Sequence, residues 1–379
     1  MAKLGELGKI ITGNTPKTSD AQNYESNDIC FVKPSDFTDN EITEIHQSEF
    51  YISAYAKDKA RVLPTDSILV TCIGIIGKVA INKVPCAFNQ QINAIVPEKK
   101  VCNPRYIAYA IQNLQPKMQS TANAAVVPIL NKTQFSNLEV PLLPVGEQKQ
   151  IACNLNKIDK LIFLRKQQLA KLDELVKARF VEMFGDPVKN TMDWEIKPLS
   201  ELGELNRGVS KARPRNSPEL LGGPYPLIQT GEVANAKTYI TSFNSTYSEK
   251  GLAQSKMWPK GTLCITIAAN IAQTSILTFD ACFPDSIVGF ISRNMTNELF
   301  IHYWFSFFQK ILDEQAPQVA QKNINLKILS ELNVIVPPLS LQNRFAAFVE
   351  RVDQQKQTVQ QSFEKLELMK KALMQEYFG

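Results

Sequence analysis

The side chains in this sequence that are best suited to binding chemistry are cations and amides on expected loops. Arg and Lys bind phosphate oxygens and guanine edges, while Asn and Gln can bond adenine through two hydrogen bonds. In the first half the candidates are Lys57, Lys59, Arg61, Lys78, Asn89, Gln90 and Gln91, and in the second half they are Arg207, Lys211, Arg213 and Arg215. The second group lies in an acid-free stretch, residues 205–218. We expect these loops to contact DNA, although a single such charge is more often an ordinary solvated residue.

Signatures of catalysis are missing from the sequence. Residues 74–78 contain a Gly-Lys pair, but the spacing is wrong for a phosphate-binding loop and no Ser or Thr follows. His46 and His302 lie in different halves, so they do not assemble a nucleophile with a base. Asp36 and Glu232 are acidic at equivalent positions, and a turn or capping role is expected for both. The seven cysteines include no C-x-x-C pair, which favours buried thiols over a zinc site or disulfides. The sequence therefore predicts a binding protein with no metal.

The two halves of the chain are internal repeats, and these are the elements that must position the loops. Residues 3–13 return as residues 198–208, and residues 63–70 return as residues 258–265, each at an offset of 195. The offset stays near this value along the chain, which indicates few net insertions between the copies. Short apolar runs punctuated by Gly, Pro, Asn and Asp predict mostly strands and loops in each globular part.

A different pattern follows each globular part. Apolar residues recur at alternating spacings of four and three, which is typical of a coiled-coil seam. The seam residues are Ile151, Leu155, Ile158, Ile162, Leu169, Leu172 and Val176 in the first copy, and Phe345, Val349, Val352, Val359, Phe363, Leu366 and Leu373 in the second. Residues 147–184 contain no Gly or Pro, so a continuous helix there would run ~57 Å at ~1.5 Å per residue. We expect the two helices to pack antiparallel on each other, with packing inside each half as the alternative.

Four domains follow from these patterns. The expected fold class is α+β, with two repeated globular α/β domains separated by two long antiparallel coiled-coil helices in a pseudo-twofold arrangement. The boundaries are 1–145 for the first globular domain, 146–190 for the central helix, 191–339 for the second globular domain and 340–379 for the C-terminal helix.

Composition supports a soluble globular protein. The 379 residues are 44% hydrophobic and 21% charged, and the net charge of +5 permits a polyanionic partner without requiring one. No apolar run approaches the length needed to cross a bilayer, and charged residues interrupt the opening segment. We expect a cytoplasmic protein with no signal peptide and no membrane partner.

The ordered set of motifs resembles the DNA specificity subunits of type I restriction-modification systems. The resemblance covers nearly the whole chain. It rests on the Leu-x-Glu-Leu-Gly openings at Leu4 and Leu199, the Pro- and Gln-containing helix entries 141–148 and 337–342, the two long helices and the Phe-Gly terminators. Each motif alone is weak, whereas the duplicated ordered set is specific.

This resemblance implies a division of labour. Each globular part would be a target recognition domain that reads one half of a bipartite, asymmetric site in double-stranded DNA. Loop residues Lys33 and Gln229 would differ between the copies because they face different bases. The helices would separate the domains and dock two methyltransferase subunits, on surfaces made inequivalent by Leu341 where the first copy has Glu147.

The resemblance also places catalysis in partner subunits of a restriction endonuclease and adenine methyltransferase complex. The methyltransferase subunits would bind S-adenosylmethionine and flip the target base, and restriction subunits would translocate DNA with ATP and Mg. The chain itself lacks the methyltransferase Asn-Pro-Pro-Tyr motif, and no cofactor is expected on it.

Two other interpretations remain at this point. The chain could be a coiled-coil dimerising module that binds proteins or glycans without DNA specificity, and such a module would show no salt-steep affinity for duplex DNA. A weaker alternative is an enzyme within the globular parts, which would act without added subunits.

Overall fold

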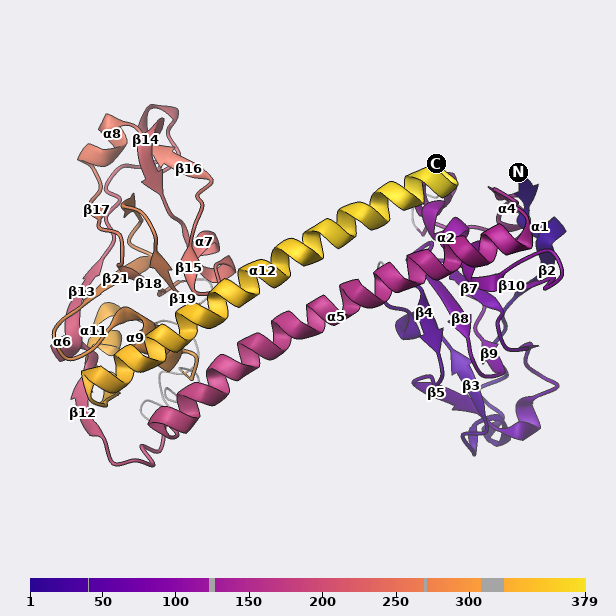
Figure 1. Ribbon diagram of the computed structural model, residues 1–379, viewed down its shortest axis with the longest axis horizontal. Helices are drawn as coiled ribbons and strands as arrows, with labels where there is room; N and C mark the ends of the chain where they lie inside the picture. The colour runs from indigo at the N-terminus through magenta and orange to yellow at the C-terminus, as the bar shows by residue number, and fades with distance from the viewer. Residues whose placement is uncertain (40, 123–126, 269–270, 308–323) are drawn as a thin grey trace. The chain divides into compact units, whose positions relative to one another are not determined.

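The chain folds into two compact units, which are described separately. The computed structural model describes residues 1–379 except 40, 123–126, 269–270 and 308–323. Unit 1 comprises Met1–Gln167 with Gln360–Gly379, and unit 2 comprises Gln168–Val359. Each unit contains one α/β domain and one half of each of the two long helices, α5 (Val145–Phe184) and α12 (Leu339–Phe378) (Figure 1).

The α/β domains of the two units have the same sheets in the same strand order. Unit 1 has the pair β1 (Ala2–Lys3) and β11 (Glu139–Val140), the five-stranded order β2 (Gly8–Thr12), β10 (Ile92–Pro97), β7 (Ile68–Thr71), β8 (Val79–Asn82), β4 (Thr43–Ile45), and the four-stranded order β5 (Phe50–Ile52), β3 (Ile29–Val32), β9 (Cys86–Phe88), β6 (Val62–Leu63).

Unit 2 repeats this arrangement strand for strand. It has the pair β12 (Glu195–Pro198) and β22 (Asn333–Val336), the five-stranded order β13 (Gly203–Arg207), β21 (Ile287–Ser292), β18 (Leu263–Thr266), β19 (Thr274–Leu277), β15 (Tyr239–Ile240), and the four-stranded order β16 (Ser245–Tyr247), β14 (Leu221–Leu227), β20 (Ala281–Cys282), β17 (Met257–Trp258). The pairings β4–β8 and β15–β19 are both parallel. The predicted duplication therefore extends to sheet topology.

Short helices connect the strands. Unit 1 has α1 (Leu4–Leu7), α2 (Pro104–Asn113), α3 (Gln115–Thr121), α4 (Lys132–Ser136) and the 3-10 turns η1 (Ala21–Tyr24), η2 (Pro34–Asp36) and η3 (Ala54–Ala56). Unit 2 has α6 (Leu199–Leu202), α7 (Thr230–Asn235), α8 (Glu249–Ala253), α9 (Glu298–Phe305), α11 (Leu326–Glu331) and η4 (Pro218–Leu220). Helices α2 and α9 begin at equivalent asparagine caps, Asn103 and Asn297, whose side chains accept a backbone N–H from the first turn.

The five-stranded sheet of each unit is buried on both faces. In unit 1 Ile68 and Val70 face a core shared with α2, whereas Leu69 faces a second core shared with the four-stranded sheet. Unit 2 repeats the alternation, with Leu263 in the helix-side core and Cys264 in the other. Alternate residues of a strand point to opposite faces, so these central strands read as continuous apolar runs.

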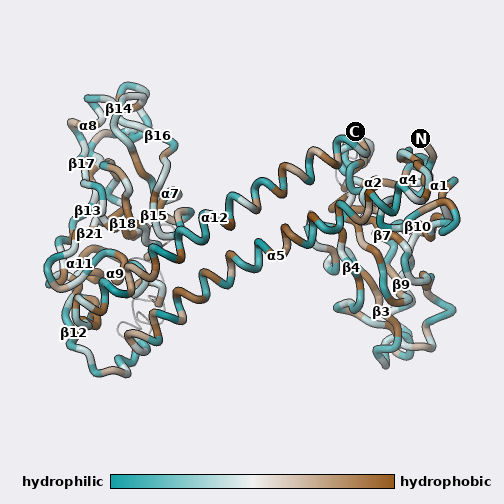
Figure 2. Tube along the Cα trace, in the orientation of Figure 1, coloured by the Kyte–Doolittle hydropathy of each residue, from teal (hydrophilic) through white to brown (hydrophobic). Residues whose placement is uncertain are grey.

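The long helices run antiparallel and in contact within each unit. In unit 1 the Lys370 ammonium lies 2.7 Å from an Asp159 carboxylate oxygen, and in unit 2 the Lys356 ammonium lies 2.7 Å from Asp173. Apolar and polar residues alternate along both helices in Figure 2. This packing confirms the predicted fold class of repeated α/β domains with long antiparallel helices.

The predicted seam residues are buried or half-buried, and those nearest the domains, such as Leu155 and Phe345, pack into the helix-side cores of units 1 and 2. Ile151, Leu155, Ile158, Ile162, Val176, Phe345, Val349, Val352 and Val359 are buried, and Leu169, Leu172, Phe363, Leu366 and Leu373 are half-buried. Aromatic side chains complete the packing at the helix ends. In unit 2 Phe180 stacks on Phe300, and in unit 1 Phe378 packs against Tyr106.

A buried glutamine fastens the start of each long helix to its own domain. The Gln148 side chain accepts the Asn103 backbone N–H and donates to backbone oxygens of Val101 and Leu143. Gln342 makes the equivalent bond to the Asn297 backbone N–H. The repeated Gln of the helix entries therefore positions the helix, which the sequence motif did not indicate.

The first long helix ends where the Gly- and Pro-free run 147–184 ends. Helix α5 stops at Phe184, so residues 185–190 of the segment assigned to the central helix lie beyond it. Gly185 adopts a φ of +76°, a left-handed conformation that ends helices, and Pro187 follows two residues later. Six of the seven cysteines are buried free thiols, and Cys153 is exposed.

The Asp159–Lys370 contact generates a stability prediction. Both side chains are less than one-fifth exposed, and the Tyr109 hydroxyl also donates to Asp159. Lys370→Met removes one partner and leaves the Asp159 carboxylate largely buried. The free energy of unfolding of unit 1 should therefore fall by about 2 kcal/mol. Hydrogen exchange of the α5 segment around Asp159 should accelerate accordingly.

The neighbouring substitution Lys371→Met is the matched control, because Lys371 is exposed. All three tryptophans, Trp194, Trp258 and Trp304, lie in unit 2, so their fluorescence should report an unchanged unit 2 in the Lys370 variant. Equal exchange rates in the two variants would show that the ion pair does not hold the helices.

Candidate nucleic-acid interface

Three chain segments of unit 1 meet where β2 ends. We call them loop set 1: residues 12–20, 57–61 and 89–91. The Asn14 amide donates to the Lys59 backbone oxygen at 2.8 Å, and its oxygen accepts the Arg61 backbone N–H at 2.9 Å. The Thr15 hydroxyl donates to the Gln90 amide oxygen at 2.7 Å. Three of the sequence-predicted residues, Lys59, Arg61 and Gln90, are thereby brought together from two separate segments.

The cations of loop set 1 are held by neutralising or polar contacts yet remain exposed. The Lys59 ammonium lies 2.9 Å from Asp20 and 3.6 Å from the centre of the Tyr55 ring. The hydrogen bond with Asp20 raises the pKa of Lys59, which keeps it charged at neutral pH. Arg61 donates through one guanidinium nitrogen to the Thr12 backbone oxygen. This contact orients the guanidinium and leaves further N–H groups for a phosphate or base edge.

The amide cluster of loop set 1 is mainly structural. Asn89 is buried, and its side chain bonds both the Gln91 amide oxygen and the Gln91 backbone N–H. Its backbone N–H donates to the Val32 oxygen at 3.1 Å, which places the turn beside the loop that contains Lys33. Of the three amides, Gln90 is the exposed one.

The other predicted residues of unit 1 have different surroundings. The Lys33 ammonium sits 3.0 Å from the centre of the Phe50 ring, beside loop set 1. Lys57 is exposed at the end of η3. Lys78 is not part of the set, because its side chain is only 13% exposed and its ammonium contacts Asp39 at 2.6 Å.

Unit 2 has an equivalent arrangement, loop set 2: residues 207–217, 254–256 and 284–286. The Gln254 amide oxygen accepts the backbone N–H groups of Lys211 and Ala212 at 2.7 and 2.9 Å. The Arg215 guanidinium pairs with Asp285 at 2.6 Å. Arg213 donates to backbone oxygens of its own loop, and Arg207 is exposed at the end of β13.

A glycine begins the loop in each set because the chain passes very close to a neighbouring turn. A Cβ on Gly13 would collide with the backbone oxygens of Phe88 and Asn89, and one on Gly208 would collide with those of Phe283 and Pro284. The repeated glycine of the opening motif is therefore required by close backbone approach. The two loop sets begin at equivalent glycines beside equivalent turns, and they carry different side chains.

This equivalence identifies a cation that was not among the residues predicted from the sequence to contact DNA. At the offset of 195, Arg61 corresponds to Lys256. Lys256 is exposed and its ammonium lies 3.9 Å from the centre of the Trp258 ring. Applying the repeat offset to the first-half candidates would have found it.

The two equivalent acids are caps. An Asp36 oxygen accepts the Lys33 backbone N–H at 2.7 Å, and a Glu232 oxygen accepts the Gln229 backbone N–H at 3.2 Å. Exposed Gln229 therefore sits at the start of α7 where Lys33 sits at the start of η2.

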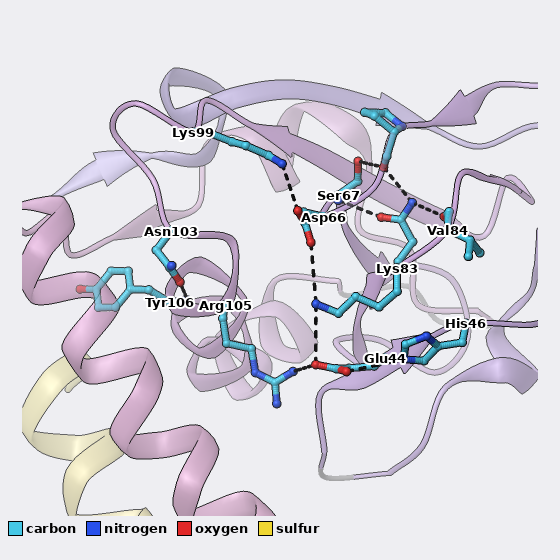
Figure 3. A network of polar contacts seen from close by, with 12 residues as sticks. Glu44, His46, Asp66, Ser67, Lys83, Val84, Lys99, Asn103, Arg105 and Tyr106 are labelled. Atoms are coloured by element: carbon cyan, nitrogen blue, oxygen red, sulfur yellow. Dashed lines mark hydrogen bonds and ion pairs between the residues drawn. The ribbon is translucent and has the colours of Figure 1, made fainter.

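Unit 1 contains a further ionic network, drawn in Figure 3. Glu44 contacts Arg105 at 3.0 Å and Lys83 at 3.8 Å, and Lys83 also lies 3.7 Å from Asp66. Lys83 is thereby engaged by two carboxylates. The corresponding residues of unit 2 are uncharged: Tyr239, Leu299, Thr278 and Gly261. This network is specific to unit 1 and lies outside loop set 1.

The described residues contain no group of His, Cys, Asp or Glu that could hold a metal ion. Among the helices in the described ranges, none combines the length and apolar character needed to span a bilayer. Two equivalent polar loop sets on a duplicated α/β fold define a protein whose architecture suits two-part recognition of an extended ligand.

The chain belongs to a known family of such proteins. The family model described as "Type I restriction modification DNA specificity domain" matches residues 1–174 and again residues 191–368. The predicted family, a DNA-recognition subunit of a multisubunit restriction system, is confirmed, and the protein- or glycan-binding alternative gains no support.

Curated relatives carry the same designation. A putative type I restriction enzyme MjaX specificity subunit of Methanocaldococcus jannaschii is 25% identical over 318 residues, which cover 79% of this chain and 73% of the relative. The type I restriction enzyme HindI specificity subunit of Haemophilus influenzae is 30% identical over 143 residues, which cover 37% of this chain and 31% of the relative.

Solved structures share the fold. A type I restriction-modification S subunit from M. genitalium has a TM-score of 0.62 at 14% identity and covers all of this chain and 95% of that one. A structure concerned with complex assembly and conformational transition of the type I R-M system has a TM-score of 0.60 at 16% identity, covering all of this chain and 96% of that one.

The loop sets generate a prediction about electrostatics. Arg61→Ala with Lys256→Ala should weaken duplex DNA binding and reduce the slope of log affinity against log salt by about 2, because two phosphate contacts are lost. Fluorescence anisotropy over a salt series measures this slope. The control pair Lys117→Ala with Lys327→Ala removes exposed lysines on α3 and α11. If both pairs change the slope equally, the loop sets are not the interface.

Proposed function

We propose that each unit reads one half of a bipartite, asymmetric sequence in double-stranded DNA. The observation that best supports this proposal is that equivalent loop positions of the two units carry different side chains. Gln90 bonded to Thr15 in loop set 1 corresponds to Asp285 bonded to Arg215 in loop set 2. An amide and a charged pair present different donor and acceptor patterns to base edges, so one scaffold can read two different sequences.

Within each loop set, some residues are suited to contact DNA phosphates and others to contact base edges. Exposed Arg61 and Lys256 occupy equivalent positions and provide sequence-independent attraction to phosphates. Gln90, Arg215 and Gln229 differ from their counterparts and are suited to base reading. The buried Asn89 supports the turn.

The proposed partners are two methyltransferase subunits and restriction subunits of a type I complex, in the cytoplasm. No cofactor is proposed for this chain; S-adenosylmethionine, ATP and Mg belong to the partners. A protein-docking role is supported in unit 1 by large apolar side chains left exposed on the long helices. These are Leu161, Phe163, Leu164, Leu368 and Met369, each 44–67% exposed.

The equivalent positions of unit 2 are more polar. They carry Gln355, Gln357, Thr358, Glu174 and Leu175. Two methyltransferase subunits that contact these helices would therefore meet different surfaces, and the one at unit 1 would bury more apolar area.

Methylome sequencing tests the reading of half-sites. Gln90→Ala should relax the sequence requirement in one half of the methylated motif, and Arg215→Ala should relax it in the other, because each residue faces one half-site. Each lost bidentate contact should reduce discrimination by about 1–3 kcal/mol at one position.

Lys327→Ala, on α11, should leave the motif intact. A motif in which both variants relax the same half would contradict the assignment of one unit to each half. Absence of any bipartite methylated motif that depends on this gene would remove the proposed function itself.

The docking role has its own test. Leu161→Gln with Leu368→Glu copies unit 2 residues, Gln355 and Glu174, onto the exposed positions of unit 1. Since both side chains are exposed, the chain should fold normally while methyltransferase affinity at unit 1 falls by about tenfold or more. Native mass spectrometry should show a shift from two bound methyltransferase subunits to one. Unchanged stoichiometry and affinity would rule out these residues as a docking surface.

A further inference from the structure

Unit 2 contains a polar cavity that the recognition function does not use. It has a volume of about 510 Å³, within the range of small-molecule sites. Residues of α5, α9, α12 and of the segments beside β15 and β19 line it, among them Lys177, Lys237, His302 and Lys356. None of these residues belongs to loop set 2.

The described residues around the cavity carry more positive than negative charge. The Lys356 ammonium is shared by Asp173 at 2.7 Å and Asp353 at 3.4 Å. The Lys237 ammonium is 3.6 Å from Asp173, and Lys177 has no acidic partner within 4 Å among the described residues. Three ammonium groups therefore share two carboxylates. Of these, Lys237 makes only a long ion pair and Lys177 makes none among the described residues. Such a lining attracts an anion.

His302 adds an uncharged hydrogen-bonding group to the cavity wall. Its Nδ1 is 2.9 Å from the Thr274 hydroxyl, while Nε2 has no hydrogen-bond partner in the described part of the chain. Burial, together with the nearby Lys356 ammonium, lowers the pKa of His302 to about 4, so the ring is neutral at physiological pH. Thr274 fixes the ring orientation and leaves the second nitrogen for a ligand.

The duplication shows that the fold does not need these polar residues. Unit 1 has Ile42, Val79, Ala108 and Ile162 at the positions of Lys237, Thr274, His302 and Lys356. All four unit 1 residues are buried and apolar. The same architecture is thus stable with a closed apolar packing, whereas unit 2 maintains a costly polar opening at the same place.

We propose that this cavity binds the phosphate group of a small molecule of about mononucleotide size. Lys177 and Lys237 would pair with the phosphate oxygens, and His302 would hydrogen-bond the ligand. Lysine suits this role because its ammonium acts as a point charge for phosphate. The volume accommodates a phosphate ester, whereas a DNA duplex could present only a backbone phosphate at the rim.

The two histidines of the chain provide a direct readout. In full-length protein with labelled histidine, NMR should show the side-chain signals of His302 shifting saturably with inorganic phosphate and with adenosine monophosphate, while those of His46 stay fixed. Adenosine, which lacks the phosphate, and potassium chloride at matched ionic strength should produce no shift. The Lys177→Ala/Lys237→Ala variant should lose affinity by about tenfold or more.

The controls keep folding and binding distinct. Lys177 and Lys237 are exposed, so unchanged tryptophan fluorescence should show that unit 2 of the double variant remains folded. Lys327→Ala should bind like the unaltered chain. The proposal is overturned if no saturable shift occurs at millimolar phosphate or adenosine monophosphate, if adenosine binds equally well, if the double variant binds unchanged, or if only duplex DNA shifts His302.

Discussion

Burial of the apolar stripe on two 40-residue helices is the constraint on which the rest of the structure depends. A single helix of this kind cannot bury its stripe alone, so each helix requires a partner along its length. Within unit 1 the register is fixed by Asp159 against Lys370, and within unit 2 by Asp173 against Lys356. Lys356 and Lys370 contribute less to apolar packing than leucine would. They specify one alignment of the helices, because a shifted register would leave partly buried charges unpaired.

The helices also determine how the α/β domains are used. Gln148 and Gln342 tie the first turn of each helix to the backbone of the domain that precedes it, while Phe378 and Phe180 bury the last turns in the cores of units 1 and 2. The orientation of each loop set is thereby coupled to helix packing in its own unit. Duplication then separates two tasks: glycines required by close backbone approach, such as Gly13 and Gly208, stay the same, while loop side chains such as Gln90 and Asp285 diverge.

Much of this architecture could be predicted because the sequence repeats at a constant offset and its apolar residues recur at regular spacings. The constant offset gave the duplication, and the alternating four and three spacing gave the long helices with their seam. The family followed from the same motifs. Individual site residues were harder, because burial and pairing depend on tertiary contacts. Asn89 was expected to contact DNA, but its side chain bonds Gln91 within its own turn. Lys78 was also expected to contact DNA, but its ammonium pairs with Asp39. The polar cavity around His302 gave no local signal, since its lining comes from distant segments.

The central claim is that two equivalent units read different half-sites. The most direct test replaces the α/β domain of unit 2 with a copy of the α/β domain of unit 1. Residues 2–140 inserted in place of residues 197–334 join the chain at equivalent strand pairs, since Ala2 pairs with Val140 as Lys197 pairs with Val334. Methylome sequencing of cells that express this chimera with its partner subunits should show a motif made of the first half-site twice, in inverted orientation. Retention of the original asymmetric motif would contradict the account.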